Sequence, residues 1–389
     1  MSKIKVAITG TGFMGSVHSE ALRRLAGVEL IGIQGSTPEK SRDAAQRLEL
    51  PRAYATWDEL VSDPEIDTVH IATPNRLHFS QTIDALEAGK HVLCEKPLAM
   101  TTAESSELAR RAAEAGKVCG VNYNIRFYPI NLEAKARVDA GELGSIHGVH
   151  GSYQQDWLLH ETDYNWRVLA EEQGELRAVA DIGTHWIDLV QMITGRRVTA
   201  VFADLHTLHP VRLRPTGEVE TFSGKVNATE AKTEPVEVTT DDIGCLLLRF
   251  EGGMRGSLFV SQVTPGRKNC LRYEIAGSRG SIAFDSEEPN AIWRGYRKKA
   301  NELLFKDPGL NGEIARRFTD YPGGHAEGFP DTFKMCFRAF YDAVREGRMP
   351  ESPSFATFEE GHREIAICEA VVRSAREGKW VETETGQTA

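Results

Sequence analysis

Short apolar runs rich in β-branched residues alternate with amphipathic runs over the first third of the chain. The apolar runs cover residues 3–8, 28–33, 68–73, 91–96 and 117–122. In the runs between them, at 16–25, 38–48, 76–89 and 102–116, apolar residues recur every three or four positions, as on one face of a helix. Repeated strand–helix–strand units with right-handed crossovers build a parallel sheet that has helices on both faces. We therefore predict an N-terminal α/β domain of the Rossmann type, with a doubly wound parallel sheet.

After residue 123 the pattern indicates a different fold class. One amphipathic run, residues 131–141, precedes strand-like runs at 146–155, 198–207, 242–253, 254–263, 271–286 and 291–297. The turns "EGG" and "GSRG" suit antiparallel hairpins. We predict an α+β C-terminal domain with a largely antiparallel sheet and a domain boundary between 1–123 and 124–389. The polar residues 208–241 lack periodicity, and we expect a long surface loop there.

Length and composition narrow the class of protein. A chain of 389 residues is longer than one hydrophobic core of ordinary size accommodates, so we expect two domains. A content of 41% hydrophobic and 26% charged residues is typical of a soluble globular protein. The net charge of −10 and the pI near 5.7 argue against nucleic acid as a partner, because phosphate binding needs a basic surface. No apolar run approaches the ~18 residues of a membrane span. The first strand begins at residue 3, and the six cysteines form no C-x-x-C pair, so we expect a cytoplasmic protein with buried thiols and no membrane partner.

The first predicted strand ends in a glycine-rich turn, "GTGFMG", at residues 10–15. Glycine has no Cβ, so it permits a tight turn and lets the backbone approach another molecule closely. The helix that follows points its unpaired N–H groups and the positive end of its dipole at that turn, which suits an anion. With a strand before it and a helix after it, the motif predicts dinucleotide binding; the alternative is an ordinary strand-to-helix turn. The candidate contacts are Gly10, Gly12, Phe13, Met14 and Gly15.

The end of the second strand bears on the choice between NAD and NADP. NAD-binding folds place an acidic residue there to bind the ribose hydroxyls, and by spacing from Pro38 this chain has Gly35 at that position. The following Ser36, Thr37, Lys40 and Arg42 could receive a 2′-phosphate, which favours NADP over NAD. A Gly-Ser turn also tolerates NAD, and Lys40 and Arg42 also fit a solvated helix face.

Two further strand ends carry candidate polar residues. Thr73 and Asn75 follow the strand at 68–73, and Glu95 and Lys96 end the strand at 91–96. In a parallel sheet, ligands bind at the carboxyl ends of the strands. A lysine there can act as an acid or base when burial or a nearby positive charge lowers its pKa. The alternative for Lys96 is an ordinary surface lysine beside Glu95.

Asp181 and His185 stand four residues apart in "VADIGTHWIDLVQMITG". This spacing puts both side chains on one helical face if the helix begins near Ile182. An imidazole held by a carboxylate and close to a lysine is a proton relay suited to taking a hydroxyl proton while a hydride leaves the same carbon. The alternative is that Asp181 is a helix N-cap and that His185 packs under Trp186.

The ordered set of motifs resembles the Gfo/Idh/MocA oxidoreductases, a family that includes inositol dehydrogenase and glucose–fructose oxidoreductase. The motifs that carry the resemblance are "GTGFMG" at 10–15, "ATPNRLH" at 72–78, "CEKP" at 94–97, "NYNIRFYP" at 122–129, "NWR" at 165–167 and "DIGTH" at 181–185. The resemblance implies that Lys96 is the catalytic lysine and that Asp181 and His185 assist it. One departure is "GELRAVADIGTH" in place of a glycine-rich lead-in to Asp181, which puts the shape of the substrate cleft in doubt.

The resemblance also implies that Trp166 and Arg167 touch the cofactor and that Arg126 lies on the nicotinamide side. The full set of cofactor-binding residues that we expect is Gly10, Gly12, Phe13, Met14, Gly15, Ser36, Thr37, Lys40, Thr73, Asn75, His78, Glu95, Lys96, Arg126, Trp166 and Arg167.

Two polar segments supply candidates for substrate contacts. The segment "YQQDWLLHETDYNW" at 153–166 mixes aromatic, amide and carboxyl groups, which suits the faces and rims of sugars. The loop "YPGGHAEGFPDTF" carries His325 and Glu327, either for substrate hydroxyls or as a purely structural loop. The substrate-binding residues that we expect are Lys96, Gln155, Asp156, Asp181, His185 and His325, with Trp157 as a further candidate, and we expect no metal site.

These observations predict an NAD(P)-dependent oxidoreductase that transfers a hydride between a secondary hydroxyl of a sugar, polyol or glycoside and the nicotinamide. One alternative is a glycoside-cleaving enzyme that uses a retained NAD transiently. Another is a non-catalytic dinucleotide-binding sensor, against which the complete set of Lys96, Asp181 and His185 argues. Residues 1–123 would form the dinucleotide-binding Rossmann domain, and 124–389 the α+β domain for substrate binding and oligomerisation. We expect a homodimer or homotetramer formed through the C-terminal sheet.

Overall fold

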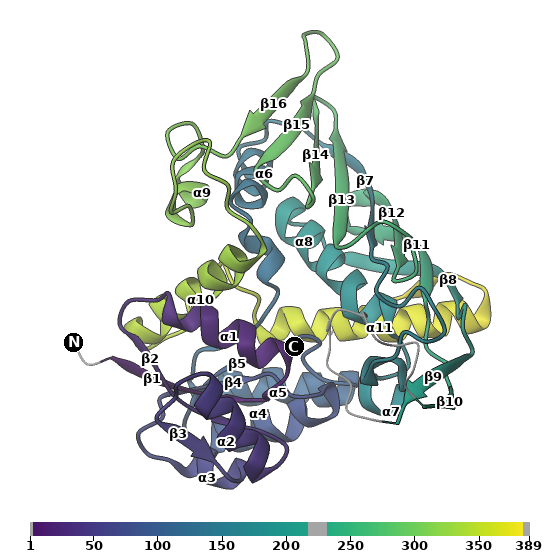
Figure 1. Ribbon diagram of the computed structural model, residues 1–389. Coiled ribbons are helices and arrows are strands. Elements are labelled where there is room, and N and C mark those ends of the chain that lie inside the picture. The colour runs from purple at the N-terminus through teal and green to yellow at the C-terminus, as the bar shows by residue number, and fades with distance from the viewer. Residues whose placement is uncertain (1–2, 217–231, 384–389) are drawn as a thin grey trace. The chain divides into compact units, whose positions relative to one another are not determined.

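The computed structural model describes residues 3–216 and 232–383, which form two compact units (Figure 1). Unit 1 contains the described residues 3–124 and 330–365, and unit 2 contains 125–216, 232–329 and 366–383. The compact units therefore do not correspond to a single cut near residue 123, because a C-terminal segment belongs with the N-terminal third. The assignment of one domain to the dinucleotide and the other to the substrate stays a prediction.

Unit 1 contains a six-stranded parallel sheet with the strand order β3-β2-β1-β4-β5-β6. The strands are β1 (Ile4–Thr9), β2 (Val28–Gln34), β3 (Arg52–Tyr54), β4 (Thr68–Ile71), β5 (His91–Cys94) and β6 (Cys119–Val121). This order places β1 and β4 side by side, where the direction of chain progression reverses. The predicted doubly wound parallel sheet is confirmed.

Helices cover both faces of this sheet (Figure 1). They are α1 (Phe13–Arg23), α2 (Pro38–Arg47), α3 (Trp57–Ser62), α4 (His78–Glu87), α5 (Thr102–Ala115) and α10 (Phe329–Glu346). Helices α3, α4 and α5 bury Leu60, Ala85 and Leu108 in one core with strand residues. On the other face α10 lies beside α1, and its Phe337 ring packs 4.8 Å from both His18 and His70, centroid to centroid.

Two short elements of unit 1, β3 and α3, are absent from the sequence prediction. Strand β3 has only three residues, Arg52–Tyr54, so it offers no apolar run to detect. It forms because its backbone pairs with the edge of β2, where Gly32 lies opposite Arg52. Helix α3 begins because the Thr56 side chain accepts a hydrogen bond from the Glu59 N–H group at 3.2 Å.

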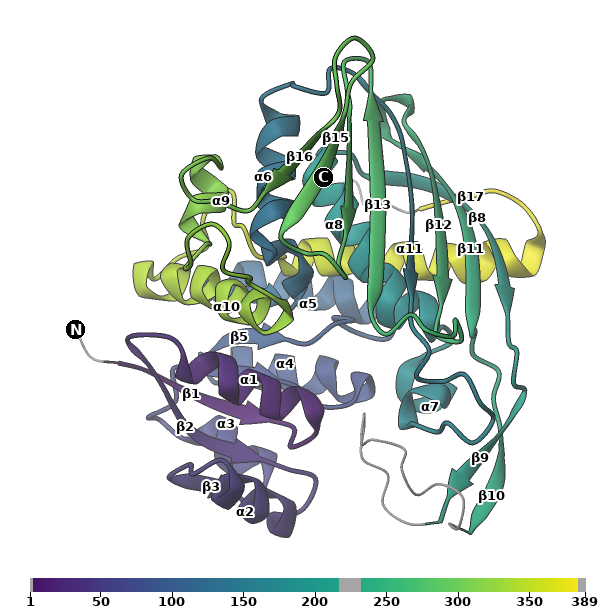
Figure 2. The same cartoon turned by 45° about the horizontal axis from the view of Figure 1, so that its top comes forward.

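Unit 2 is built on a nine-stranded sheet with the order β16-β15-β14-β13-β7-β12-β11-β8-β17 (Figure 2). The strands are β7 (Ile146–Gln154), β8 (Val198–His206), β11 (Ile243–Phe250), β12 (Arg255–Ser261), β13 (Cys270–Gly277), β14 (Ser281–Asp285), β15 (Ala291–Gly295), β16 (Glu302–Phe305) and β17 (Val381–Glu382). The β7–β12 pair is parallel and every other pair in this sheet is antiparallel. The predicted α+β unit with a largely antiparallel sheet is confirmed.

The core of unit 2 lies on one face of its sheet. The helices of this unit are α6 (Pro129–Asp139), α7 (Ala170–Gln173), α8 (Thr184–Thr194), α9 (Glu313–Arg317) and the second part of α11 (Phe358–Glu377). Ile130 of α6, Trp186 of α8 and Val371 of α11 pack in one cluster with inward residues of the strands.

The prediction of a long surface loop over 208–241 is wrong in part. Strands β9 (Val211–Pro215) and β10 (Thr233–Glu237) form a two-stranded antiparallel sheet, while 217–231 lie outside the described residues. The strand signal was hidden because Arg212 is fully buried and pairs with Asp242. A charged residue at an inward position breaks the apolar pattern on which a strand prediction depends.

Burial of the cysteines follows the prediction with one exception. Cys94, Cys119, Cys270 and Cys336 are buried and Cys368 is half-buried, but Cys245 of β11 is exposed. Strand β11 alternates exposed and buried positions, and Cys245 falls on the exposed face. Among the described residues, no helix has both the length and the apolar character needed to cross a bilayer.

Candidate functional site

Two glycines of the "GTGFMG" turn are required by the fold. Gly10 has φ +108°, and a Cβ on it would lie 2.3 Å from the Ala72 carbonyl oxygen. A Cβ on Gly15 would lie 2.1 Å from the carbonyl oxygen of Gly10. These approaches join the end of β1 to the loop after β4 and seat α1 against the turn. Gly10 and Gly15 are therefore explained by packing alone.

Gly12 is different, because no contact with the described residues requires it. Its φ of −74° suits any residue, and no described heavy atom would lie within 4 Å of an added Cβ. It is the N-cap of α1, and as a glycine it has no side chain with which to cap that end of the helix. A helix N-terminus beside an open glycine is a cradle into which a diphosphate fits. Phe13, 41% exposed, and the half-buried Met14 follow in the first turn.

The end of β2 has no room for the acidic residue of NAD-binding folds at Gly35. A Cβ there would lie 2.9 Å from Thr11 Cγ2 and 3.1 Å from the Ser41 backbone nitrogen. The Gly35 N–H group donates to Ser41 Oγ at 2.8 Å, which holds this turn against α2. Among the predicted phosphate contacts, Ser36 and Lys40 are exposed.

Two other residues near this turn have structural partners. Thr37 is the N-cap of α2 and accepts from the Lys40 N–H group at 3.2 Å. Arg42 pairs with Glu39 at 2.6 Å, so it fits the alternative of a solvated helix face.

The loop after β4 is tied to the loop after β5 by His78. Its Nδ1 lies 2.7 Å from the Pro97 carbonyl oxygen and its Nε2 lies 2.9 Å from that of Thr73. Burial lowers the pKa of this histidine. Thr73 Oγ1 donates to Gln81 at 2.7 Å, and Asn75 is buried in a short 3₁₀ turn, Asn75–Leu77. His78 therefore holds together the two strand-end loops that carry Thr73 and Lys96.

Glu95 and Lys96 directly follow β5. Glu95 is 5% exposed, and its carboxylate accepts hydrogen bonds from His18, Asn122 and the Lys96 N–H group. Burial raises the pKa of Glu95, but the hydrogen bond from His18 and the other donors outweigh burial and bring it to about 2. Lys96 is half-buried. Both the catalytic role of Lys96 and the alternative of an ordinary surface lysine beside Glu95 stay predictions.

In unit 2 the helix that carries Asp181 and His185 begins earlier than predicted. A π-helical turn, Val179–Gly183, precedes α8, so Asp181 lies inside the helical segment and is not its N-cap. The cap comes from Asp241, whose carboxylate accepts from the N–H groups of Arg177 at 2.6 Å and Val179 at 2.9 Å. π-Helical turns often occur at functional sites. Sequence spacing could not show a cap that comes from more than 60 residues away.

A buried polar cluster orients Asp181. Gln262 Nε2 donates to Asp181 Oδ2 at 2.7 Å, and Gln262 Oε1 accepts from Arg177 Nη1 at 2.6 Å, so the amide has one fixed orientation. Arg177 and Arg212 both pair with Asp242, and all three side chains are fully buried. Sequence analysis missed Gln262, Arg177 and Asp242, because their side-chain hydrogen bonds to one another and to Asp181 join residues 65 to 85 positions apart.

Arg167 lies beside Asp181, although the two were assigned different roles. Arg167 Nε is 3.6 Å from Asp181 Oδ1, and its guanidinium stacks over the Trp166 ring at 4.5 Å. Trp166 and Arg167 belong to a 3₁₀ turn, Trp166–Val168, which is capped by Asn165. His185 is 8% exposed, and its ring centroid lies 6.4 Å from that of Tyr153.

The structure brings Gln155 into this group and gives Asp156 another partner. Gln155 Oε1 accepts from Trp157 Nε1 at 2.8 Å and lies 3.4 Å from Gln262 Nε2, which also binds Asp181. Asp156 instead pairs with Lys268 at 2.6 Å. Of the two residues, Gln155 is the one connected to the Asp181 cluster.

Two other predicted site residues have distinct surroundings. Arg126 is 3% exposed and forms a buried ion pair with Asp188 of α8, with Nε 2.8 Å from Oδ2, which fits a role in packing. His325 is exposed in a loop anchored by Lys306. The Lys306 ammonium donates to the His325 carbonyl oxygen at 2.7 Å and to Glu327 Oε2 at 2.7 Å.

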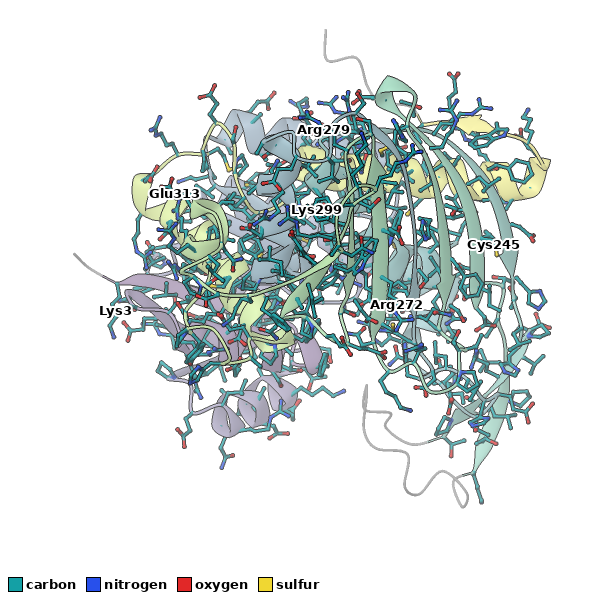
Figure 3. All side chains as sticks on the ribbon, turned by 90° about the horizontal axis from the view of Figure 1, so that it is seen from above. Lys3, Cys245, Arg272, Arg279, Lys299 and Glu313 are labelled. Carbon is teal, nitrogen blue, oxygen red and sulfur yellow. The ribbon has the colours of Figure 1, made fainter. Side chains whose placement is uncertain are left out.

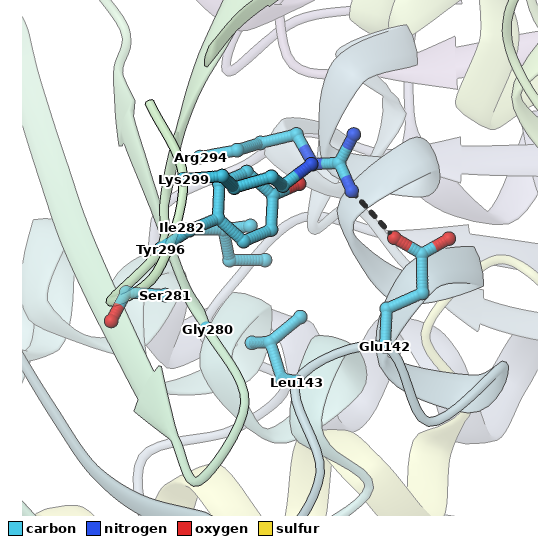
Figure 4. Close-up of a pocket in the computed structure, with 8 residues that line it drawn as sticks. All are labelled: Glu142, Leu143, Gly280, Ser281, Ile282, Arg294, Tyr296 and Lys299. Atoms are coloured by element: carbon cyan, nitrogen blue, oxygen red, sulfur yellow. Dashed lines mark hydrogen bonds and ion pairs between the residues drawn. The ribbon is translucent and has the colours of Figure 1, made fainter. Parts of the chain in front are cut away.

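A pocket of about 210 Å³ in unit 2 contains none of the predicted site residues (Figure 4). Arg294 on its wall pairs with Glu142 at 2.7 Å and with Glu302 at 3.0 Å. Lys299 pairs with Glu302 at 2.6 Å. Since both cations of the wall are engaged by carboxylates, this pocket lacks the character of a phosphate or substrate site.

One group of side chains in the described ranges has ligand atoms close enough for a metal ion: Cys270, Asp285 and Glu287. Arg272 pairs with both carboxylates. We assign this group to an ion-pair cluster.

A parallel sheet with a glycine cradle at a helix N-terminus, joined in one chain to an α+β unit, defines the class of NAD-binding oxidoreductases. Residues 4–123 match the oxidoreductase family described as having an NAD-binding Rossmann fold, and 131–283 match the GFO/IDH/MocA C-terminal domain. The chain belongs to the Gfo/Idh/MocA oxidoreductase family, which confirms the resemblance.

Individual relatives extend this likeness to nearly the full length. Levoglucosan dehydrogenase of Pseudarthrobacter phenanthrenivorans is 32% identical over 98% of both chains. Inositol 2-dehydrogenase 2 of Mycolicibacterium vanbaalenii is 30% identical over 97% of this chain and 94% of its own. A structure of levoglucosan dehydrogenase in complex with NADH and L-sorbose superimposes with a TM-score of 0.88 at 29% identity, covering 99% of this chain and 100% of the other.

Proposed function

We propose that this protein is an NAD(P)-dependent dehydrogenase that oxidises a secondary hydroxyl of a sugar, polyol or glycoside, or catalyses the reverse reaction. The observation that carries the proposal is Gly12, a glycine that no contact with the described residues requires, at the N-cap of α1. The relatives named for levoglucosan and inositol support the substrate class. When bound, the nicotinamide dinucleotide supplies the acceptor for the hydride.

The N-terminal end of α1 would hold the diphosphate, with Gly10, Gly12 and Gly15 allowing the close approach. The turn after β2 would contact the ribose of the adenosine half. No acidic side chain stands at Gly35 and none fits there, so nothing repels a 2′-phosphate at this point. The exposed Ser36 and Lys40 support a preference for NADP over NAD.

Three side chains are proposed for the transfer of the hydroxyl proton. Lys96 would take the proton, and Asp181 and His185 would position the substrate and share the charge. Arg167 and Gln262 each contact one carboxylate oxygen of Asp181, which supports a fixed acceptor rather than a mobile surface group. Lys96 belongs to unit 1, whereas Asp181 and His185 belong to unit 2. That the three residues act together is therefore a hypothesis, which the kinetics of single and double variants test.

The test is a panel of sugars, anhydrosugars and inositols assayed with both NAD and NADP. Steady growth of reduced-nicotinamide absorbance with at least one substrate is the expected result. Cleavage of a glycoside without net reduction of the cofactor would support the retained-NAD alternative. Tight dinucleotide binding with no turnover on any substrate would favour the sensor.

We also propose that the C-terminal sheet mediates homo-oligomerisation. The helices of the core pack on one face, whereas the opposite face presents Leu247, Trp293 and Leu303, which are 50%, 37% and 56% exposed. Cross-strand register places Leu303 opposite Trp293. Cys245 and Arg272 lie on strands of the same sheet (Figure 3). The adjacent exposed side chains of Trp293 and Leu303 support a protein partner on this face.

A further inference from the structure

A chain of buried polar side chains in unit 1 ends on the carboxylate next to Lys96. Tyr341 OH lies 2.7 Å from His70 Nε2, His70 Nδ1 lies 2.9 Å from His18 Nδ1, and His18 Nε2 lies 2.8 Å from Glu95 Oε1. The residues come from α10, β4, α1 and the end of β5. Four elements that are distant in sequence therefore meet through three hydrogen bonds.

The side chains of this hydrogen-bonded series are buried. His18, His70 and Tyr341 are fully buried, and Glu95 is 5% exposed. Phe337 packs edge-on against both imidazoles with centroids 4.8 Å away. The loss of any one member leaves the next side chain without its hydrogen bond. This loss is destabilising, because a buried polar group without a partner is costly.

The hydrogen atoms of the chain can be assigned by counting donors and acceptors. Glu95 is ionised, since its pKa is about 2, and it can only accept, so His18 Nε2 carries a hydrogen. Burial holds the pKa of His70 well below its usual value, so that ring is neutral and has one N–H group. Since Nε2 of His18 carries a hydrogen, all three bonds are satisfied when Tyr341 donates to His70, His70 to His18, and His18 to Glu95.

The low pKa of Glu95 decides between two roles for the chain. A proton conductor needs members whose pKa values lie near the working pH, and a carboxylate at about 2 does not take up a proton there. A carboxylate held in one orientation is instead suited to fixing its neighbours. Glu95 Oε2 accepts from the Lys96 backbone N–H group at 3.3 Å, and Oε1 also accepts from Asn122.

We propose that His18 is a positioning residue, which fixes Glu95 and through it the backbone of Lys96 against the helix that begins at the glycine-rich turn. His70 and Tyr341 support His18 from behind. This inference rests on the proposed function in one respect, the role of Lys96 in turnover. Small displacements of a reacting group can lower the rate about 100-fold, so a shift in the position of Lys96 should lower kcat.

The test compares His18→Leu with His18→Gln, whose amide nitrogen replaces Nε2 as a donor to Glu95. We expect His18→Leu to lower kcat about 10- to 100-fold with cofactor binding within about 3-fold of wild type. His18→Gln should recover most of kcat.

Lys90→Met is the matched control, because Lys90 precedes the amino end of the same β5 and donates to the carbonyl oxygens of Asp63 and Ile66 at 2.8 Å. It destabilises unit 1 without touching Glu95. Wild-type kcat in folded His18→Leu, no recovery in His18→Gln, or an equal loss in Lys90→Met would each overturn the proposal.

A second measurement does not depend on turnover. Amide hydrogen exchange of Lys96, whose N–H group binds Glu95, should speed up in His18→Leu and stay slow in His18→Gln and Lys90→Met. Unchanged exchange in His18→Leu contradicts the proposal even if Lys96 proves to be catalytic. If His18→Leu does not fold, exchange in His18→Gln as fast as in the unfolded chain contradicts it. Wild-type kcat in Lys96→Met with the expected exchange pattern would reject only the catalytic role of Lys96.

Discussion

At the scale of single residues, the glycines of the first turn separate packing from ligand binding. Gly10 and Gly15 cannot carry a side chain because backbone oxygens lie 2.3 and 2.1 Å from the added Cβ. Gly12 has open space. The sequence motif predicted all three together, and the structure shows that packing requires only Gly10 and Gly15.

Gly12→Val should therefore abolish dinucleotide binding while the protein stays folded. A Cβ at this position has no described atom within 4 Å beyond its chain neighbours and its own helix, and the valine side chain fills the space in front of the α1 N-terminus. Isothermal titration measures the binding, and circular dichroism checks that the thermal midpoint is unchanged. Wild-type affinity in the folded variant would rule out this turn as the diphosphate site.

Cofactor choice is best tested at Ser36. Gly35→Asp would force its Cβ to within 2.9 Å of Thr11, whereas Ser36 is exposed and accepts a new side chain. Ser36→Asp should lower the ratio of kcat/KM for NADP to that for NAD by about 10-fold or more, because a carboxylate repels a 2′-phosphate. Ser36→Asn is the neutral control of the same size. An unchanged ratio would place the ribose elsewhere.

Loss of the proton acceptor should slow turnover more than binding. Lys96→Met keeps most of the side-chain length and removes the ammonium, so kcat should fall by ~10²–10⁴-fold with cofactor affinity largely retained. His185→Ala should cost a similar factor, and the double variant should lose far less than the product of the two. Multiplicative losses in the double variant would show that the two residues act independently.

At the scale of elements, the start of the Asp181 helix shows the limit of sequence spacing. The motif "DIGTH" correctly indicated a helix, but its first turn is set by Asp241, a residue of a different segment. The strands β9 and β10 were missed for the same reason, since buried Arg212 is satisfied by Asp242. Local periodicity finds elements whose polar groups face water and misses those whose polar groups are paired across the fold.

Asp241 should give the protein a pH-dependent stability. Burial raises the pKa of its carboxyl to about 6, although two backbone N–H groups bind it, whereas an unfolded aspartate titrates near ~3.9. The folded state therefore holds the proton more tightly, and this contribution to the free energy of unfolding decreases as pH rises from about 4 to about 6. In Asp241→Asn that decrease should vanish from urea titrations. An identical pH slope in both proteins would contradict the assignment.

At the scale of the whole molecule, the pattern of apolar and amphipathic runs predicted both fold classes, and the ordered motifs from residue 10 to residue 185 predicted the family. The sequence could not predict that α10 packs in unit 1, since no motif in α10 indicates which part of the chain it contacts. It also could not supply the orientation of Asp181, which depends on a buried amide, Gln262, and on the arginine behind it.

The proposed oligomer should depend on the exposed sheet face. Leu247→Asp combined with Leu303→Asp places charges on that face without entering the core, so the subunits should dissociate while keeping their thermal midpoint as monomers within a few degrees. Light scattering coupled to size-exclusion chromatography measures the mass. Glu29→Lys, an exposed change on β2, is the control, and a monomeric wild type would reject the proposal.

The return of α10 to unit 1 has a consequence for synthesis on the ribosome. The six-stranded sheet is complete once residue 124 has emerged, but the face that holds His70 is then covered only by α1, because Phe337 and Tyr341 of α10 lie about 200 residues further along. At translation rates of about 5–20 residues per second, that face waits for roughly 10 to 40 seconds. During this interval His70 lacks its contacts with Phe337 and Tyr341, so we expect unit 1 to need protection from aggregation until its last helix arrives.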